Sequence, residues 1–158
     1  MKTNTKSKSK TVQAIPDGYH TVTPFLMLDN AQEFLSFIEK AFDAHTEFVM
    51  KDEHDKIIHA SAKIGNSPVM LGDTMDGQKP TSGVFYLYVE NADNAYNQAV
   101  AVEGAKSTRE LRDEYYGDRA GCVEDKWGNH WWLATHTEDV SEEELKERHM
   151  KLLTEEHA

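Results

Sequence analysis

The sequence has few of the features that would anchor a protein in a membrane or cross-link it. Its 158 residues include a single cysteine, Cys122, which excludes an intramolecular disulfide and is typical of a reducing cytoplasm. No stretch approaches the roughly 18 consecutive apolar residues that a membrane helix requires. Four lysines near the amino terminus are not followed by an apolar segment, so we expect no secretory signal and interpret residues 1–18 as a disordered tail. These features together predict a cytoplasmic protein.

Basic residues are also scarce, with 17 lysines and arginines against 28 aspartates and glutamates. The tail holds four of the basic residues and one acidic residue, which leaves the body with 13 basic and 27 acidic residues and a net charge of −14. Such a body repels nucleic acid phosphates and anionic membranes. No glycine-rich loop of phosphate-binding spacing is present. We therefore expect neither nucleic acid nor membrane as a partner.

What the sequence does contain is an internal repeat. LDNAQEFLSFIEKAF predicts a helix that Asn30 can cap, and VENADNAYNQAVAV predicts a second helix, 61 residues later, that Asn91 can cap. A β-rich segment precedes each helix, at residues 21–28 and 83–89. Two pairs of hairpin-like turns downstream keep nearly the same offset, so each half reads as a strand, a helix and three further strands.

The repeat predicts an α+β fold with two tandem βαβββ modules, at residues 19–76 and 77–137. A C-terminal helix from about residue 142 to 154 is expected within the remaining segment, 138–158, because its apolar residues recur at helical spacing. Ser141 and Glu144 have the spacing of a capping box at its start. The leucines of this helix are expected to pack on the body or on a partner.

Four segments carry a resemblance to a known family: VTPFLMLDNAQEFLSFIEKAF, KIIHASAKIGNSPVMLGD, DRAGCVEDKWGNHWWLATH and DVSEEEL. Together with the tandem modules, they resemble the PhnB-like branch of the vicinal oxygen chelate superfamily, which includes glyoxalase I, bleomycin-resistance proteins and extradiol dioxygenases. The resemblance covers about residues 18–147. It implies that the two modules form a curved, open mixed sheet around a cavity, with helices on the outside, and that the protein is a homodimer.

Alternation along the strands indicates which side chains would line that cavity, because successive residues point to opposite faces. Val22 and Ile58 are expected on the helix side of their strands, and His59 on the cavity side. By the same rule Trp131 belongs to the core, whereas Trp132 faces the cavity. This pattern, together with Met70, which the resemblance places at a metal-ligand position of the family, predicts a ligand pocket lined by Thr23, Phe25, Met27, His59, Met70, Val84, Tyr86, Tyr88 and Trp132.

The usual metal centre of the superfamily is expected to be missing. The resemblance places its four ligand positions on Thr23, Met70, Val84 and Trp132, none of which supplies an imidazole or a carboxylate. We therefore expect no metal and no other cofactor. His59 stays open between two interpretations: a hydrogen-bond donor, base or lone metal ligand in the cavity, or a histidine satisfied by a neighbouring side chain.

Two functions agree with this reading. The first is binding of a small apolar or aromatic molecule in the cavity. The alternative is a metal-dependent isomerase, lyase or dioxygenase of the same superfamily with a rearranged site around His59. No motif identifies catalytic residues: Arg109 and Arg112 could hold an anion but have acidic neighbours, and Asp118 with Arg119 is most simply a structural salt bridge.

Overall fold

The computed structural model describes residues 12–156, so residues 1–11 of the predicted tail lie outside the described part of the chain. Residues 12–24 contain turns and bends but no helix or strand. The elements of the first module are β1 (Phe25–Leu28), α1 (Ala31–Phe42), β2 (His45–Lys51), β3 (Ile57–Ile64) and β4 (Ser67–Asp73). Those of the second are β5 (Val84–Tyr88), α2 (Ala92–Val100), β6 (Lys106–Asp113), β7 (Asp118–Glu124) and β8 (His130–His136), and α3 (Glu142–Glu156) follows.

Each module forms one four-stranded mixed sheet. Sheet A has the order β1-β4-β3-β2 and sheet B the order β5-β8-β7-β6. In both, the first strand is parallel to the last, and the remaining neighbours are antiparallel. This confirms the predicted pair of βαβββ modules, and it leaves β1 and β5 as edge strands of their sheets.

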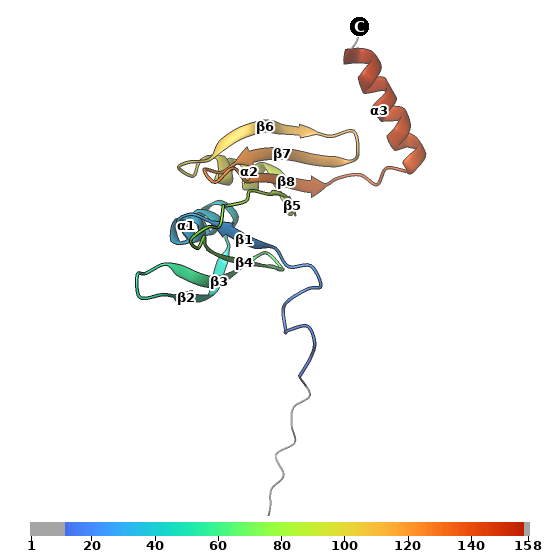
Figure 1. Cartoon of the computed structure of the whole chain (residues 1–158). Helices are drawn as coiled ribbons and strands as arrows, with labels where there is room; N and C mark the ends of the chain where they lie inside the picture. Colours follow the sequence, from blue (N-terminus) through green and yellow to red (C-terminus); the bar gives the residue numbers. More distant parts are fainter. Residues whose placement is uncertain (1–11, 157–158) are drawn as a thin grey trace, which may run out of the picture.

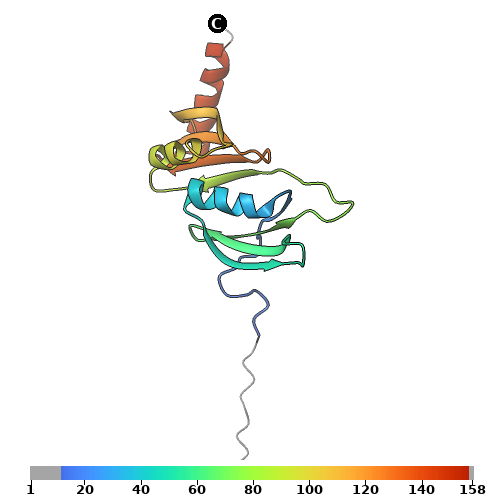
Figure 2. The ribbon, with the colours of Figure 1, turned by 90° about the vertical axis from the view of Figure 1, so that its left-hand side faces the viewer.

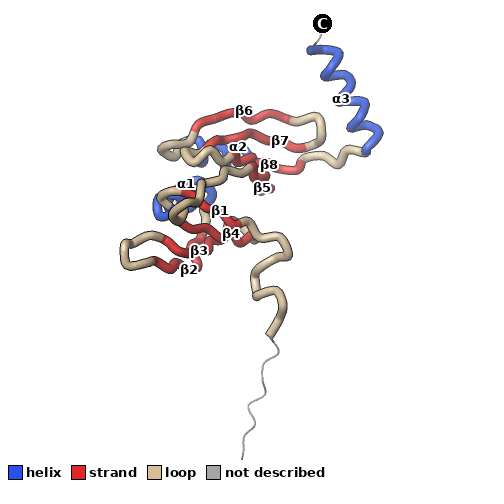
Figure 3. Tube along the Cα trace, viewed as in Figure 1, coloured by secondary structure: helices blue, strands red, loops and turns tan. Residues whose placement is uncertain are grey.

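Helix α1 lies between the two sheets (Figures 1 and 2). It packs on β2, β3 and β4 of its own module, while its Phe34 and Phe42 contact Trp131 of β8, with ring centroids 6.3 and 4.7 Å apart. Helix α2 packs on β6, β7 and β8 and also touches α1 (helices are blue in Figure 3). One hydrophobic core therefore runs through both modules. We call the face of each sheet that is turned away from α1 its outer face.

The helix caps follow the prediction in one module only. In α2, the side chain of Asn91 accepts a hydrogen bond from the N–H of Asn94 at 2.9 Å, as predicted. Asn30, in contrast, makes no side-chain cap for α1 and adopts a left-handed backbone with φ of 60°. The N–H of Ala31 donates instead to Asp73 Oδ1 at 2.8 Å. The cap of α1 thus comes from the end of β4, which lies far away in sequence.

Two residues predicted on the helix side of their strands lie elsewhere. The first strand begins only at Phe25, so Val22 precedes it and is 83% exposed. In β3, a register shift against β2 places Ile58 and His59 consecutively on the outer side of the strand. Ile57 is fully buried in the position that the alternation had given to Ile58, which is 37% exposed. The bulge leaves the prediction for His59 unchanged.

Helix α3 is attached to the body near its first turns. Ser141 Oγ accepts the N–H of Glu144 at 3.2 Å, which is one half of the predicted capping box. The Glu144 carboxylate binds Arg148 instead of completing the box, and Arg148 also holds Glu138 and the carbonyl of Tyr115. These bonds fix the start of α3 against the end of sheet B.

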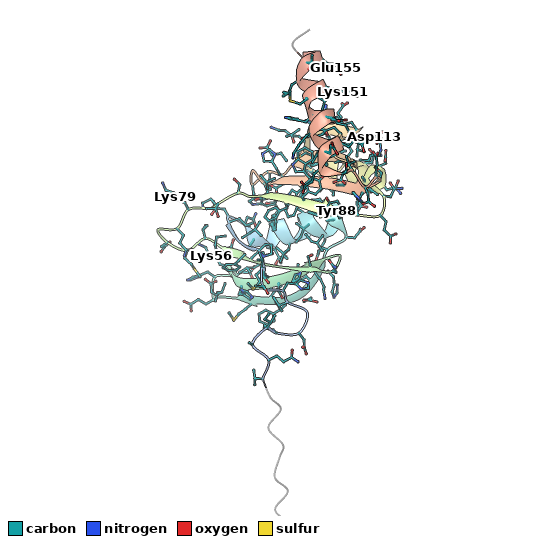
Figure 4. All side chains as sticks on the ribbon, turned by 90° about the vertical axis from the view of Figure 1, so that its right-hand side faces the viewer. Lys56, Lys79, Tyr88, Asp113, Lys151 and Glu155 are labelled. Carbon is teal, nitrogen blue, oxygen red and sulfur yellow. The ribbon has the colours of Figure 1, made fainter. Side chains whose placement is uncertain are left out.

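The rest of α3 extends away from both sheets, as the positions of Lys151 and Glu155 show in Figure 4. Leu152 and Leu153 are 40% and 41% exposed in the single chain, so the packing of these leucines on a partner stays a prediction. Among the residues that the structure describes, no helix has both the length and the apolar character needed to cross a membrane.

Candidate functional site

The nine predicted pocket residues divide between two surfaces. Met27, His59 and Met70 belong to sheet A together with Phe25, and Thr23 lies just before β1. The other four residues lie on sheet B: Val84, Tyr86, Tyr88 and Trp132. Because α1 stands between the sheets, the structure gathers the predicted residues into two separate groups within one chain.

The outer face of sheet A is mainly apolar. Phe25 is paired with Met70 across β1 and β4, and Met70 is followed across the sheet by Ser61 and Phe48. Phe25 and Phe48 are 49% and 51% exposed. The ring of His59 lies between them, with centroid distances of 5.8 and 6.2 Å. This face therefore offers an apolar surface around the imidazole of His59, with His45 and Lys63 paired toward its end, and Phe48 belongs to it although it was not predicted.

The outer face of sheet B is aromatic. Tyr86 is stacked against Trp132 with centroids 5.9 Å apart, and Tyr88 is tilted against Tyr86 at 5.2 Å. Val84 and Tyr88 are 68% and 65% exposed, and Tyr86 is 39% exposed. These side chains lie on strands at or next to the edge of the sheet, so a flat ligand could reach them.

The turn before β8 decides which of the adjacent tryptophans joins this face. Asp125 is 3% exposed and accepts the N–H of Trp127, the N–H of Asn129 and Nε1–H of Trp131, each at 2.9 Å. Gly128 supplies the positive φ of 80° that the turn requires. The bond to Asp125 holds Trp131 on the helix side, where it is 1% exposed, and alternation then puts Trp132 on the outer face.

A buried carboxylate lies at the start of β7, at one end of the outer face of sheet B. Asp118 is 3% exposed, and its Oδ2 accepts hydrogen bonds from the phenols of Tyr86 and Tyr88 at 2.8 and 3.0 Å. Its Oδ1 lies 2.8 Å from Nδ1 of His136, whose Nε2 lies 2.8 Å from Asp139. Although burial alone would raise it, the hydrogen bonds from His136, Tyr86 and Tyr88 keep the pKa of Asp118 below its ordinary value. Asp118 is therefore an ionised, fully satisfied carboxylate.

The pKa values of Tyr86 and His136, which contact this carboxylate, are raised. The hydrogen bonds to Asp139 and Asp118 raise the pKa of His136. The pKa of Tyr86 is raised by burial and by its hydrogen bonds to Tyr116 and Asp118. The phenol of Tyr86 therefore stays protonated, and the two carboxylates favour the charged form of His136.

The two arginines of this face are held by one carboxylate. Glu114, whose side chain is 4% exposed, receives two hydrogen bonds from Arg109, at 2.8 and 3.1 Å, and one from Arg112 at 3.1 Å. The guanidinium of Arg109 also lies 5.6 Å from the ring centroid of Trp132. Cys122 is buried beneath, and burial raises the pKa of its thiol, as expected for a packed residue and not for a nucleophile.

The predicted Asp118–Arg119 salt bridge is not formed. Arg119 points to the helix side, where it binds Asp93 at 2.7 and 2.8 Å and Asp113 at 3.3 Å. The role of Asp118 was missed for this reason, although strand alternation contains the signal: His136 shares the parity of Trp132 and lies opposite Asp118 in the register.

The residues at the four expected metal positions do not fit a divalent cation. Thr23 donates its hydroxyl to the carbonyl of His20, and Met70, Val84 and Trp132 offer no oxygen or imidazole ligand. Among the side chains that the structure describes, at residues 12–155, no three histidines, cysteines, aspartates or glutamates come together in a way that could hold a metal ion.

A cleft of about 870 Å³ lies between the modules, on the helix side of β5. Its apolar part is formed by Phe42, Phe85 and Trp131, and its rim by the β3–β4 turn and the start of α2. Of the predicted pocket residues, only Tyr86 and Tyr88 reach it. Strand β5 thus separates this cleft from the outer face of sheet B.

Comparison with known proteins identifies relatives of this architecture. A family profile described as "Glyoxalase/Bleomycin resistance protein/Dioxygenase superfamily" matches residues 19–133. The uncharacterized protein Mb0911c of Mycobacterium bovis is 33% identical over an alignment of 136 residues, and the match covers 79% of this chain and 89% of that protein. Among solved structures, TioX from Micromonospora sp. ML1 has a TM-score of 0.63 at 19% identity, covering 73% of this chain and 97% of TioX. A putative 3-demethylubiquinone-9 3-methyltransferase, PhnB protein, from Bacillus cereus has a TM-score of 0.58 at 18% identity, covering 73% and 99%.

Proposed function

Because the chain belongs to the glyoxalase/bleomycin resistance protein/dioxygenase superfamily, we propose that it binds a small apolar or aromatic molecule against the outer faces of its two sheets. One observation carries the proposal: both faces expose large apolar side chains that a folded chain normally covers. Phe25, Phe48 and Met50 are 44–51% exposed on sheet A, and Val84 and Tyr88 are 65–68% exposed on sheet B. Exposed apolar surface of this kind marks ligand-binding or subunit contacts.

A second copy of the chain would complete the site. Within one chain the two outer faces point away from each other, because α1 lies between the sheets. A twofold axis would bring sheet A of each copy opposite sheet B of the other copy. The dimer would then contain two such pairs of facing sheets. The free edges of β1 and β5 favour this arrangement, since unpaired strand edges are otherwise a liability in solution. The protein is thus a homodimer with two equivalent sites, each formed by both copies.

No specific observation favours the alternative, a metal-dependent isomerase, lyase or dioxygenase centred on His59. The ring contacts described for His59 are with Phe25 and Phe48, which cannot bind a metal. His59 instead provides a polar group in an apolar wall, suited to one hydrogen bond with a ligand. The single cysteine, Cys122, supports the predicted cytoplasmic location.

A fluorescence screen tests ligand binding. Small aromatic compounds are expected to quench the tryptophan emission of the parent protein, and the quenching is expected to fall strongly in Trp132→Phe. Trp127→Phe is the matched control, because Trp127 lies against Phe34 and Phe37 on the helix side. Equal loss of quenching in the two variants, or none in Trp132→Phe, would contradict a site on the outer face of sheet B.

Light scattering tests the dimer separately. The chain has a mass of 18.0 kDa, so a homodimer has about 36 kDa, and this value is expected at micromolar concentration. A mass of 18.0 kDa would refute the shared site while leaving ligand binding to be judged by the fluorescence screen.

A further inference from the structure

The hydrogen bonds on the outer face of sheet B also indicate what kind of polar group a ligand must carry. This step depends on the proposed binding at that face. A tyrosine phenol has one hydrogen to donate. Tyr86 and Tyr88 both direct theirs to Oδ2 of the buried Asp118, at 2.8 and 3.0 Å. Their oxygens therefore have only lone pairs left for a ligand.

The same reasoning extends to Tyr116. Its phenol oxygen lies 3.2 Å from that of Tyr86, and geometry alone allows either to be the donor. Since the hydrogen of Tyr86 is committed to Asp118, the donor in this contact is Tyr116. Tyr116 thus donates to Tyr86, and Tyr86 and Tyr88 both donate to Asp118. The hydrogens of three neighbouring phenols are therefore directed toward one carboxylate. All three present acceptors outward.

Positive groups on this face do not compensate for the missing donors. Arg109 and Arg112 are both held by Glu114, Lys106 is paired with Glu124, and His136 lies between Asp118 and Asp139. Three cations and one imidazole are therefore matched by four carboxylates, within a body whose net charge is −14. An anion at the phenols would meet lone pairs and no excess of positive charge.

We propose that this face selects molecules that carry a protonated amine beside an aromatic or apolar group. The ammonium would donate to the phenol oxygens of Tyr88 and Tyr116, both of which keep unused lone pairs. The attached ring would lie on the stacked pair of Tyr86 and Trp132. Aromatic faces attract cations, which adds to the preference for an amine. Carboxylates and phosphates of the same size would bind poorly.

A matched pair of probes tests this preference: 2-phenylethylamine, which is a cation at neutral pH, and 3-phenylpropionate, which is an anion. Affinities are measured by NMR titration of the full-length protein. The amine is expected to bind at least about tenfold more tightly, a difference of about 1.4 kcal/mol. Tyr88→Phe removes one acceptor from an exposed position and should reduce the preference severalfold. Tyr96→Phe is the control, because Tyr96 belongs to α2 and its phenol donates to Ser107, away from the outer face.

Asp118→Leu tests the origin of the preference. Leucine is of similar size but has no acceptor, so the phenols of Tyr86 and Tyr88 lose the partner of their hydrogens and can donate them to a ligand. The preference for the amine is expected to disappear, with a circular dichroism spectrum that stays like that of the parent. If this variant does not fold, Tyr88→Phe alone decides. Equal or tighter binding of 3-phenylpropionate by the parent overturns the inference and leaves small-molecule binding intact. If neither probe binds, both proposals fail.

Discussion

Replacement of Trp131 by alanine is expected to be the most destabilising single change in the second module. The side chain is 1% exposed and stacks on Phe85 at 4.5 Å, and it also contacts Phe34 and Phe42 of α1. An aromatic side chain buries about 150–250 Å², which at about 25 cal/mol per Å² is worth about 4–6 kcal/mol. Alanine keeps part of that contribution, so we expect a loss of about 3–5 kcal/mol in the free energy of unfolding. Because Trp131 joins both modules, the loss should affect the cooperativity of the whole chain.

The hydrogen bond of Trp131 adds little to this figure. Asp125 loses one donor but keeps the N–H groups of Trp127 and Asn129 and the side-chain amide of Asn129. Trp131→Phe, which retains most of the packing, should therefore cost only about 1–2 kcal/mol.

Urea unfolding followed by circular dichroism measures these differences, at one protein concentration for all variants because dimerisation shifts apparent stability. Trp132→Ala is the comparison, since Trp132 lies half-buried on the outer face, and its cost should stay below about 2 kcal/mol. If Trp132→Ala unfolds the protein while Trp131→Ala is nearly neutral, the assignment of the two faces of β8 is wrong. The proposed site would then have to be redrawn.

Three further outcomes are expected. The purified protein should carry no stoichiometric divalent metal. A chelator should leave its melting temperature unchanged, because only a tightly held ion would stabilise the native state. Near-stoichiometric nickel, zinc, iron or manganese in metal analysis would contradict this. The raised pKa of His136 means that its charged form stabilises the fold fully below the ordinary pKa of 6.5 and that this contribution is lost as the pH rises through the folded-state value. The melting temperature of the parent should therefore fall relative to that of His136→Gln between about pH 6 and pH 9, and parallel profiles would argue against the bonds to Asp118 and Asp139. If both copies form each site, a ligand found in the fluorescence screen should tighten the dimer in sedimentation equilibrium, and an unchanged dissociation constant would place the whole site within one chain.

The fold could be predicted because the same pattern of strands, helix and turns occurs twice in the sequence. The helical spacing of apolar residues, the caps and the hairpin turns recur with nearly one offset, and alternation along β8 correctly separates Trp131 from Trp132. The errors have local causes. A β-bulge in β3 moves Ile58 out of the core without any change in composition, and Asp73 replaces Asn30 as the cap of α1 from 42 residues away. Neither a bulge nor a distant cap leaves a signal in the short window that such patterns use.

Only part of the candidate site on sheet B was anticipated from the sequence. Alternation found the aromatic residues of β5 and β8, because aromatic side chains on a strand edge are conspicuous. It missed Asp118 and His136, because a short-range reading joined Asp118 to its neighbour Arg119. In the structure these two side chains point to opposite faces of β7, and each finds its partner on another element. Charged residues that are adjacent in a strand cannot share a face, so the alternation rule should have taken precedence over the apparent ion pair.

The assembly is harder to infer from the sequence, because alternation along a strand shows which side chains share a face of the sheet but not what covers that face. Parity puts Phe25 and Trp132 on faces turned from the helices, and in a single chain α1 holds those faces apart. Exposed hydrophobic surface of this kind is typical of a contact with a ligand or a second copy, as the proposed function requires. In the proposed dimer, a second copy offers each outer face a complementary surface: sheet A has the imidazole of His59 among phenylalanine rings, whereas sheet B carries acceptors and aromatic rings. A ligand with an apolar body and one donating group matches that pairing, and neither sheet alone could surround it.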